Sequence, residues 1–240
     1  AGLTYQTDGT ASGGVILWTS NGSGTFDNPT SPNAIYTPSA ADKATGTVVL
    51  TMTVTPPGNC NIPIASDSVV LTIYPVSAGG IVTGTSTVCT GTNSVTLRLS
   101  EYTGSIQWQS SPNNSSWSSI SGATSASYTP STLTTTTYYR AVLTSGVCSS
   151  SESSVATITV SPSSVAGVIS GATSVCSGTN STVLSVAGNT GAIQWQSSTD
   201  NVTFNSIVGA TSATYTATNL TTTKYYRVAV SNSVCSVVYS

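Results

Sequence analysis

Hydrophobic and polar side chains alternate along this chain in short runs rather than at helical spacing. Such period-two runs, separated by Gly, Ser, Asn and Pro about every ten residues, are typical of a β-sandwich. In the middle of the chain the pattern predicts strands at 80–83, 94–99, 105–110, 125–129, 136–143 and 154–160. No stretch has a convincing helical period, so we predict an all-β fold.

Two positions within these strands match the core of immunoglobulin and fibronectin III domains. Because side chains alternate between the faces of a strand, Ile106 and Trp108 point inward, and Trp108 corresponds to the core tryptophan of those domains. Tyr139 also points inward, and Leu133 precedes it by six residues, a spacing that resembles their tyrosine corner. We therefore predict Ig-like or fibronectin-III-like β-sandwich domains.

The chain repeats itself at a fixed offset of 87 residues without a gap, so that Cys89 aligns with Cys176 and Cys148 aligns with Cys235. The longer matches are Gln-Trp-Gln at 107–109 and 194–196, Gly-Ala-Thr-Ser at 122–125 and 209–212, and Tyr-Tyr-Arg at 138–140 and 225–227. Internal repeats mark arrays of small structural units. They favour a spacer or a multivalent binder over an enzyme, since a catalytic centre is seldom duplicated within one short chain.

We expect three tandem domains, at residues 1–75, 76–162 and 163–240. The first keeps Trp18 and repeats the Tyr-Thr-Pro-Ser of 128–131 at 36–39, but it lacks the Gln-Trp-Gln and Tyr-Tyr-Arg signatures. Aligned against the repeat, the first domain is expected to be incomplete at its N-terminus and the third at its C-terminus. Pro75 and Pro162 leave few residues between domains, so the links should be stiff and the neighbouring repeats should form a rod.

The chain contains five cysteines, and four of them recur in the repeat. The spacing from Cys89 to Cys148 equals the spacing from Cys176 to Cys235, so we predict one disulfide within each of the second and third domains. Disulfides require an oxidising compartment. Cys60 is left over and is expected to be unpaired, because the alignment places its partner just before the first residue. A free surface thiol is the alternative.

Charged residues make up only 5% of the chain, which has a net charge of −2 and contains no histidine. Five basic residues are too few to form a basic surface for a nucleic acid. No run approaches the roughly 18 apolar residues that span a bilayer. Without histidine, neither a Ser-His-Asp nor a Cys-His nucleophile can form. The acids lack the close spacing of calcium ligands, and the cysteines lack zinc-ligand spacing. We therefore predict no enzymatic activity, no metal, no cofactor, no nucleic-acid partner and no membrane insertion.

One outward face of the predicted sandwich carries amides, aromatic rings and guanidinium groups in both repeats. Its residues are Gln107, Gln109, Tyr138 and Arg140, and in the second copy Gln194, Gln196, Tyr225 and Arg227. Amides and aromatic rings can bind sugars through hydrogen bonds and stacking, so this face is a candidate site for polysaccharide. The alternative is that these residues only form favourable cross-strand pairs on an exposed sheet.

Several motifs together resemble a known repeat: Trp-Gln-x-Ser, a following aromatic (Trp117 or Phe204), Ile-x-Gly-Ala-Thr, and Leu-Thr-x-Thr-x-Tyr-Tyr-Arg. They are similar to the Ig-like repeats of very large surface adhesins that Bacteroidota export through the type IX secretion system, including gliding-motility adhesins. In the first domain, residues 37–42 and 67–71 resemble a sister repeat type. The resemblance implies secretion through the periplasm, cell-surface filaments and adhesion. Asp67-Ser68-Val69 also resembles the O-glycosylation motif of that phylum, with Ser68 as the modified residue.

These observations favour a structural role outside the cell. We expect a repetitive segment of a bacterial surface adhesin or filament, a disulfide-stapled spacer that supports adhesion and, by the resemblance, gliding motility. Its partners would be the neighbouring repeats of the same chain, with surface polysaccharide or other cells as further partners. Two alternatives remain: an array of carbohydrate-binding modules that uses the Gln/Tyr/Arg face, and a non-catalytic appendage of a secreted hydrolase.

Overall fold

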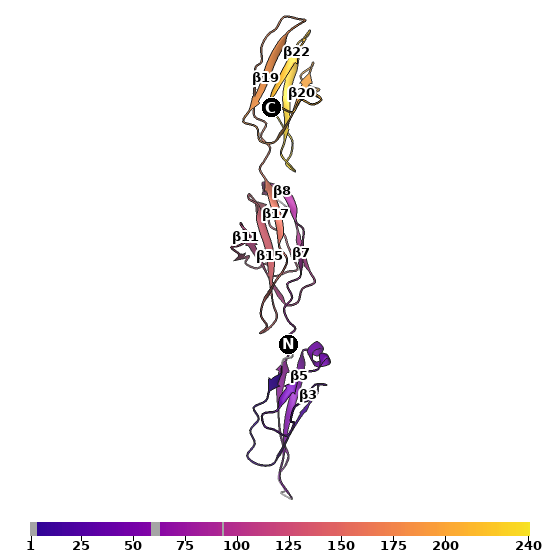
Figure 1. Ribbon diagram of the computed structural model, residues 1–240, viewed down its shortest axis with the longest axis vertical. Helices are drawn as coiled ribbons and strands as arrows, with labels where there is room; N and C mark the ends of the chain where they lie inside the picture. The colour runs from indigo at the N-terminus through magenta and orange to yellow at the C-terminus, as the bar shows by residue number, and fades with distance from the viewer. Residues whose placement is uncertain (1–3, 59–62, 93) are drawn as a thin grey trace. The chain divides into compact units, whose positions relative to one another are not determined.

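The structure is a computed structural model that describes residues 4–58, 63–92 and 94–240. Apart from one six-residue helix, the regular elements of the described part are β-strands (Figure 1). Their sheets fall into three successive groups, which we call the first (residues 5–72), second (81–161) and third sandwich (168–239). The all-β prediction is confirmed.

By its internal contacts the chain divides into two compact units. One unit comprises Ala1–Gly79, Tyr102–Ser105 and Leu143–Ser151, and the other comprises Gly80–Glu101, Ile106–Val142 and Glu152–Ser240. The second unit therefore contains most of the second sandwich and the whole of the third.

The first sandwich packs two sheets around the side chains of Trp18, Tyr36, Val48 and Leu50. Its elements are β1 (Tyr5–Gln6), β2 (Val15–Ser20), β3 (Thr25–Phe26), β4 (Ile35–Thr37), α1 (Ala40–Thr45), β5 (Thr47–Thr55) and β6 (Ala65–Thr72). One sheet has the strand order β1-β4-β3 and the other has the order β2-β5-β6.

Helix α1 was not expected, because six residues are too few to show an amphipathic period. It is specified instead by its two ends. Ser39 and Asp42 form a capping box, in which the Asp42 N–H donates to the Ser39 hydroxyl and the Ser39 N–H donates to the Asp42 carboxylate. Gly46 ends the helix with φ of 78°, a left-handed conformation that glycine adopts without steric cost.

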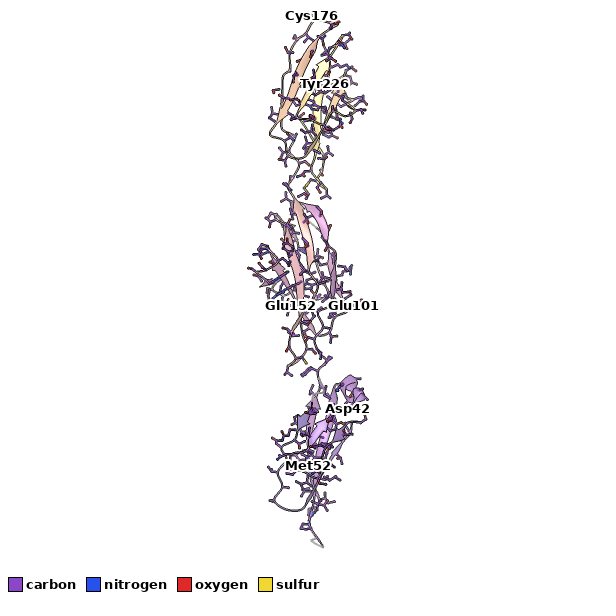
Figure 2. All side chains as sticks on the ribbon, in the orientation of Figure 1. Asp42, Met52, Glu101, Glu152, Cys176 and Tyr226 are labelled. Carbon is purple, nitrogen blue, oxygen red and sulfur yellow. A yellow bond between two sulfur atoms is a disulfide. The ribbon has the colours of Figure 1, made fainter. Side chains whose placement is uncertain are left out.

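Asp42 also ties the helix to the rest of the first sandwich (Figure 2). Its buried carboxylate accepts hydrogen bonds from the Tyr36 hydroxyl at 2.8 Å and from the Ser23 N–H at 2.9 Å. Burial alone would raise the pKa of Asp42, but the backbone N–H groups of Ser23 and Ser39 and the hydroxyls of Tyr36 and Ser39 outweigh it and lower the pKa to about 2.

We expect the first sandwich to be sensitive to acid through Asp42. A carboxyl whose pKa is lowered from 3.8 to about 2 on folding stabilises the fold above about pH 4, and this contribution is lost as the pH falls toward 2. Thermal unfolding measured between pH 7 and 2 should therefore show a melting temperature that decreases once the pH is below about 4. Asp42→Asn should already lower the midpoint at pH 7 and flatten its dependence on pH in this window. An unchanged midpoint at pH 7 would contradict the role given to this carboxylate.

The second sandwich is built around a fully buried Trp108. Its strands are β7 (Ile81–Thr83), β8 (Ser86–Cys89), β9 (Gly91–Thr92), β10 (Leu97–Ser100), β11 (Ser105–Ser111), β12 (Ser118–Ser119), β13 (Ser127–Tyr128), β14 (Thr132–Leu133), β15 (Thr137–Thr144), β16 (Ser151–Glu152) and β17 (Ala156–Ser161). One sheet has the order β13-β10-β7, the other has the order β12-β11-β15-β17-β8 with β16 on β15, and β14 pairs with β9.

The inward positions predicted for this domain are confirmed. Ile106, Trp108 and Tyr139 are all buried. The indole Nε1 of Trp108 donates to the Ser125 carbonyl at 2.8 Å, and its ring packs against Tyr128, which in turn packs against Tyr139. The period-two pattern thus identified the core because burial on one face of each strand sets that period.

Strand β8 was not predicted, although its position decides where Cys89 lies. It pairs in parallel with β17, with Ser86 opposite Ile158 and Cys89 opposite Ser161. A four-residue edge strand with a parallel neighbour gives a weak sequence signal, because its alternation is too short to distinguish from a loop. The pairing places Cys89 beside the C-terminal end of β17.

The third sandwich repeats the second around Trp195. Its strands are β18 (Val168–Ser170), β19 (Ser181–Ala187), β20 (Ala192–Ser198), β21 (Asn205–Ser206), β22 (Thr214–Thr218), β23 (Tyr225–Ser231) and β24 (Val238–Tyr239). The sheets have the orders β18-β19-β22 and β21-β20-β23-β24. Trp195, Val228 and Val230 are fully buried in its core, as their counterparts are in the second sandwich.

Candidate functional site

A disulfide joins the second sandwich to the third. Cys89, at the end of β8, is bonded to Cys235, in the loop that follows β23, with 2.07 Å between the sulfur atoms and 5.0 Å between the Cα atoms. The two cysteines are 146 residues apart in the sequence. We call this bond the inter-repeat disulfide, because it links two recurring positions of the repeat unit across consecutive copies rather than within one.

The predicted pairs Cys89–Cys148 and Cys176–Cys235 are therefore wrong, and among the described cysteines Cys148 and Cys176 are free. The reason is the direction of β15. Its first residue, Thr137, lies opposite Ile158, so the end of β17 beside Cys89 lies at the start of β15, whereas Cys148 follows the end of β15. The eight residues of β15 separate the two sulfurs by roughly 26 Å at about 3.3 Å per residue, far beyond disulfide reach. Cys60, predicted to be unpaired, lies outside the described residues.

The loop that carries Cys235 also holds the link between the two sandwiches. The Cys235 sulfur lies 3.3 Å from the Pro162 carbonyl oxygen, and the Asn232 side chain donates to the same carbonyl at 2.8 Å. The Asn232 N–H donates to the Ser164 hydroxyl at 3.0 Å. Covalent and hydrogen-bonded contacts thus fix the link from both sides of Pro162.

The loop after β15 contacts the preceding link in a related way. The Cys148 thiol donates to the Tyr74 carbonyl at 3.8 Å, which is the same contact, at the offset of the repeat, as that between Cys235 and the Ser161 carbonyl at 3.7 Å. Gly146 lies so close to Tyr74 that a Cβ atom there would overlap the ring.

The structure directs the predicted outward amides toward partners within the domain. The Gln107 side chain donates to the Ile120 carbonyl at 2.8 Å, and Gln194 donates to the Ile207 carbonyl at 2.7 Å. Each glutamine thereby fastens the loop that follows β12 or β21 to the central strand. Their N–H donors are used inside the domain and are not presented to a ligand.

Arg140 lies at the centre of the predicted ligand face and is enclosed by its neighbours. Its Nε donates to Gln109 at 2.9 Å, its guanidinium stacks over the Trp117 ring at 4.4 Å from the ring centroid, and it forms an ion pair with Glu152. Cation–π contacts and the amide therefore hold the guanidinium in one position. The candidate face brings Gln109 and Arg140 together, while Tyr138 is half-buried beside them.

The same cluster recurs in the third sandwich with one informative exchange. Arg227 donates to Gln196 at 2.7 Å and lies between the rings of Phe204 and Tyr239, at 4.2 and 4.1 Å from their centroids. Tyr239 occupies the position of Glu152 in the repeat. The guanidinium therefore contacts a carboxylate in one copy and an aromatic ring in the other. Tyr225 is 41% exposed. Ligand binding by this face stays a prediction.

Comparison with known proteins identifies the repeated region. Residues 78–162 and 165–240 match the family described as Domain of unknown function (DUF8696). The chain belongs to this family. The two DUF8696 repeats contain the second and third sandwiches, including all four cysteines at the repeated positions.

Other comparisons add little to this assignment. No curated protein matches the chain. Among solved structures, the chain is similar to that in "Crystal structure of chicken CNTN1 FN1-FN3 domains", with 12% sequence identity, coverage of 100% of this chain and 97% of that chain, and a TM-score of 0.30.

The remaining candidate site lies outside the DUF8696 repeats. Ser68, the predicted O-glycosylation residue, is exposed on β6, and its hydroxyl shares a hydrogen bond of 2.9 Å with the Thr51 hydroxyl. Its modification stays a prediction. In the part of the chain that the structure describes, no group of three or more His, Cys, Asp or Glu side chains is arranged to hold a metal ion.

No helix among the described residues has the length and apolar character needed to cross a lipid bilayer.

The feature that sequence reasoning missed is the pairing between repeats. Its signal was present in the order of the elements, because Cys89 precedes the second predicted strand and Cys148 follows the Tyr-Tyr-Arg strand. The equal spacing of the two cysteines in both DUF8696 repeats favoured pairing within a domain, whereas the strand directions place these positions at opposite ends of it.

Proposed function

We propose that this chain is a tension-bearing spacer segment of a secreted adhesive filament, in which disulfides join consecutive DUF8696 repeats. The observation that carries the proposal is the bond between Cys89 and Cys235. Domains that share only a small non-covalent interface move relative to one another by default. A covalent bond beside a short link restricts that motion, which suits a spacer that must hold a binding region away from a surface.

The disulfide also supports a location outside the cytoplasm, because such bonds persist in oxidising compartments. The resemblance of the repeats to type IX-secreted adhesins supports placing the filament on the surface of a Bacteroidota cell, where it would serve adhesion and gliding motility. In this proposal the neighbouring repeats form a rod. Polysaccharide or other cells are then the partners of a terminal binding region rather than of the repeats themselves.

The engagement of the Gln/Tyr/Arg face supports a spacer over a carbohydrate-binding array. The donors of Gln107 and Gln194 are used within their domains, and aromatic rings cover the guanidinium groups of Arg140 and Arg227. A sugar would have to displace these contacts, whereas a structural role uses them as they stand.

Two measurements test the proposal. Antibodies against the chain should label intact, unpermeabilised cells of the source organism, and labelling only after permeabilisation would overturn the surface location. On a glycan array the oxidised chain should bind no glycan above the level of a double variant, Arg140→Ala with Arg227→Ala. Glycan binding that this variant abolishes would replace the spacer by the carbohydrate-binding function.

A further inference from the structure

The end of the third sandwich carries a cysteine whose counterpart is bonded in the preceding repeat. Cys176 aligns with Cys89 at the offset of the repeat. Cys89 is bonded to Cys235, whereas Cys176 is an exposed free thiol at the end of its sandwich (Figure 2). The same position of the repeat is thus disulfide-bonded in one copy and a free thiol in the other.

The residues around Cys176 are also less ordered into strands and more exposed than the residues around Cys89. Residues 86–89 form β8 against β17, whereas the corresponding residues 173–176 are outside any strand, and Val175 is 38% exposed. Leu133 is 7% exposed in the second sandwich, whereas its counterpart Leu220 is only half-buried. These two apolar positions are thus more exposed in the third sandwich than in the second.

A groove lies beside residues 173–177 of the third sandwich. It has a volume of about 470 Å³ and runs between residues 173–177 and residues 220–224. In the second sandwich β17 lies between the corresponding segments, paired with β8 on one side and with the start of β15 on the other. The groove therefore has the position and the edges that receive a strand of the β17 type, with Ala156 and Ile158 as its buried side chains.

We propose that Cys176 and this groove form the docking site for a further DUF8696 repeat. The groove takes the strand that leads into that repeat, and Cys176 forms an inter-repeat disulfide with its cysteine at the Cys235 position. This inference concerns how repeats join, and it holds whether the joined repeats act as a spacer or bind a ligand.

The covalent step balances with a disulfide oxidant such as oxidised glutathione. The Cys176 thiolate attacks one sulfur of oxidised glutathione, forms a mixed disulfide and releases one glutathione thiolate. The thiolate of the incoming cysteine then attacks the Cys176 sulfur of the mixed disulfide, forms the protein disulfide and releases the second glutathione thiolate. The two protons lost by the protein thiols end on the two glutathione molecules.

The test lengthens the full chain by one repeat in register. Ser240 corresponds to Ser153, so a second copy of residues 154–240 placed directly after Ser240 supplies both the strand for the groove and a further Cys235. After refolding with oxidised and reduced glutathione, non-reducing peptide mapping should find Cys176 linked to the appended copy of Cys235. The Cys89–Cys235 bond in the same molecule reports that the joined repeats have folded.

Two further outcomes decide the proposal. If Cys176 is recovered as a free thiol, linked to Cys148, or linked to a second molecule while Cys89–Cys235 is formed, the proposal is overturned. Ile158→Asp in the appended copy alone should lower the yield of the Cys176 bond severalfold, since a charged side chain cannot take the buried position of that strand. An unchanged yield with this variant would overturn the assignment of the groove.

Discussion

When the oxidised chain is pulled from its two ends, the residues between Cys89 and Cys235 are expected not to extend. The bond carries the tension past 146 residues of sequence, so neither the interior of the second sandwich nor the third can lengthen the chain. Reduction should release about 480–530 Å of additional length at 3.3–3.6 Å per residue. Single-molecule force spectroscopy with and without reductant measures this difference directly.

A matched pair of cysteine variants tests which disulfide prevents these residues from extending. Cys235→Ser should show the full extension without reductant, whereas Cys176→Ser should behave as the unmodified chain. Bonds within each sandwich would instead hide two separate segments, 89–148 and 176–235, and Cys176→Ser would then release the second of them. Extension that does not change with reductant would show that no bond shields the repeats.

Removing the core tryptophan of the second sandwich is expected to cause the largest loss of stability. Trp108 is 0% exposed, its indole donates to the Ser125 carbonyl, and its ring packs on Tyr128. Trp108→Ala should lower the free energy of unfolding of this sandwich by about 3–5 kcal/mol, because a cavity replaces the ring. Urea unfolding at equilibrium, followed by circular dichroism, measures the loss.

Trp117 provides the matched control, since it is the same residue type in the same sandwich but only half-buried. Its ring stacks on the Arg140 guanidinium, and such a contact contributes about 0.5–1 kcal/mol at an exposed site. Trp117→Ala should therefore cost several times less than Trp108→Ala. Equal losses would mean that the core lies elsewhere than around Trp108.

The sequence predicted the core well because burial acts through the period of the strands. Trp108 and Tyr139 were placed inside by alternation alone, and burial raises the pKa of Tyr139 to about 12. Alternation could not reveal α1 or β8, which are too short to complete a period. Capping by Ser39 and pairing with β17 form these elements, and both are contacts between positions rather than patterns along the chain.

The candidate ligand face shows a different limit of the same reasoning. Gln107 occupies an outward position, yet its flexible side chain folds back onto the Ile120 carbonyl. Alternation along a strand gives the direction of the Cα–Cβ bond. The end of a long polar side chain can still turn back to bond a nearby unsatisfied backbone group. An outward position is therefore not the same as a group free to bind.

The inter-repeat disulfide makes the order of events during synthesis important. In a chain made from its N-terminus, Cys148 is synthesised 59 residues after Cys89, whereas Cys235 follows Cys89 only after 146 residues. The wrong partner is thus available before the right one. Once the second sandwich has folded, β15 holds Cys148 roughly 26 Å from Cys89, and the wrong bond cannot close. Folding of each repeat before its oxidation is therefore what selects the partner, and an oxidant that acts on the nascent chain too early would trap it in the shorter loop.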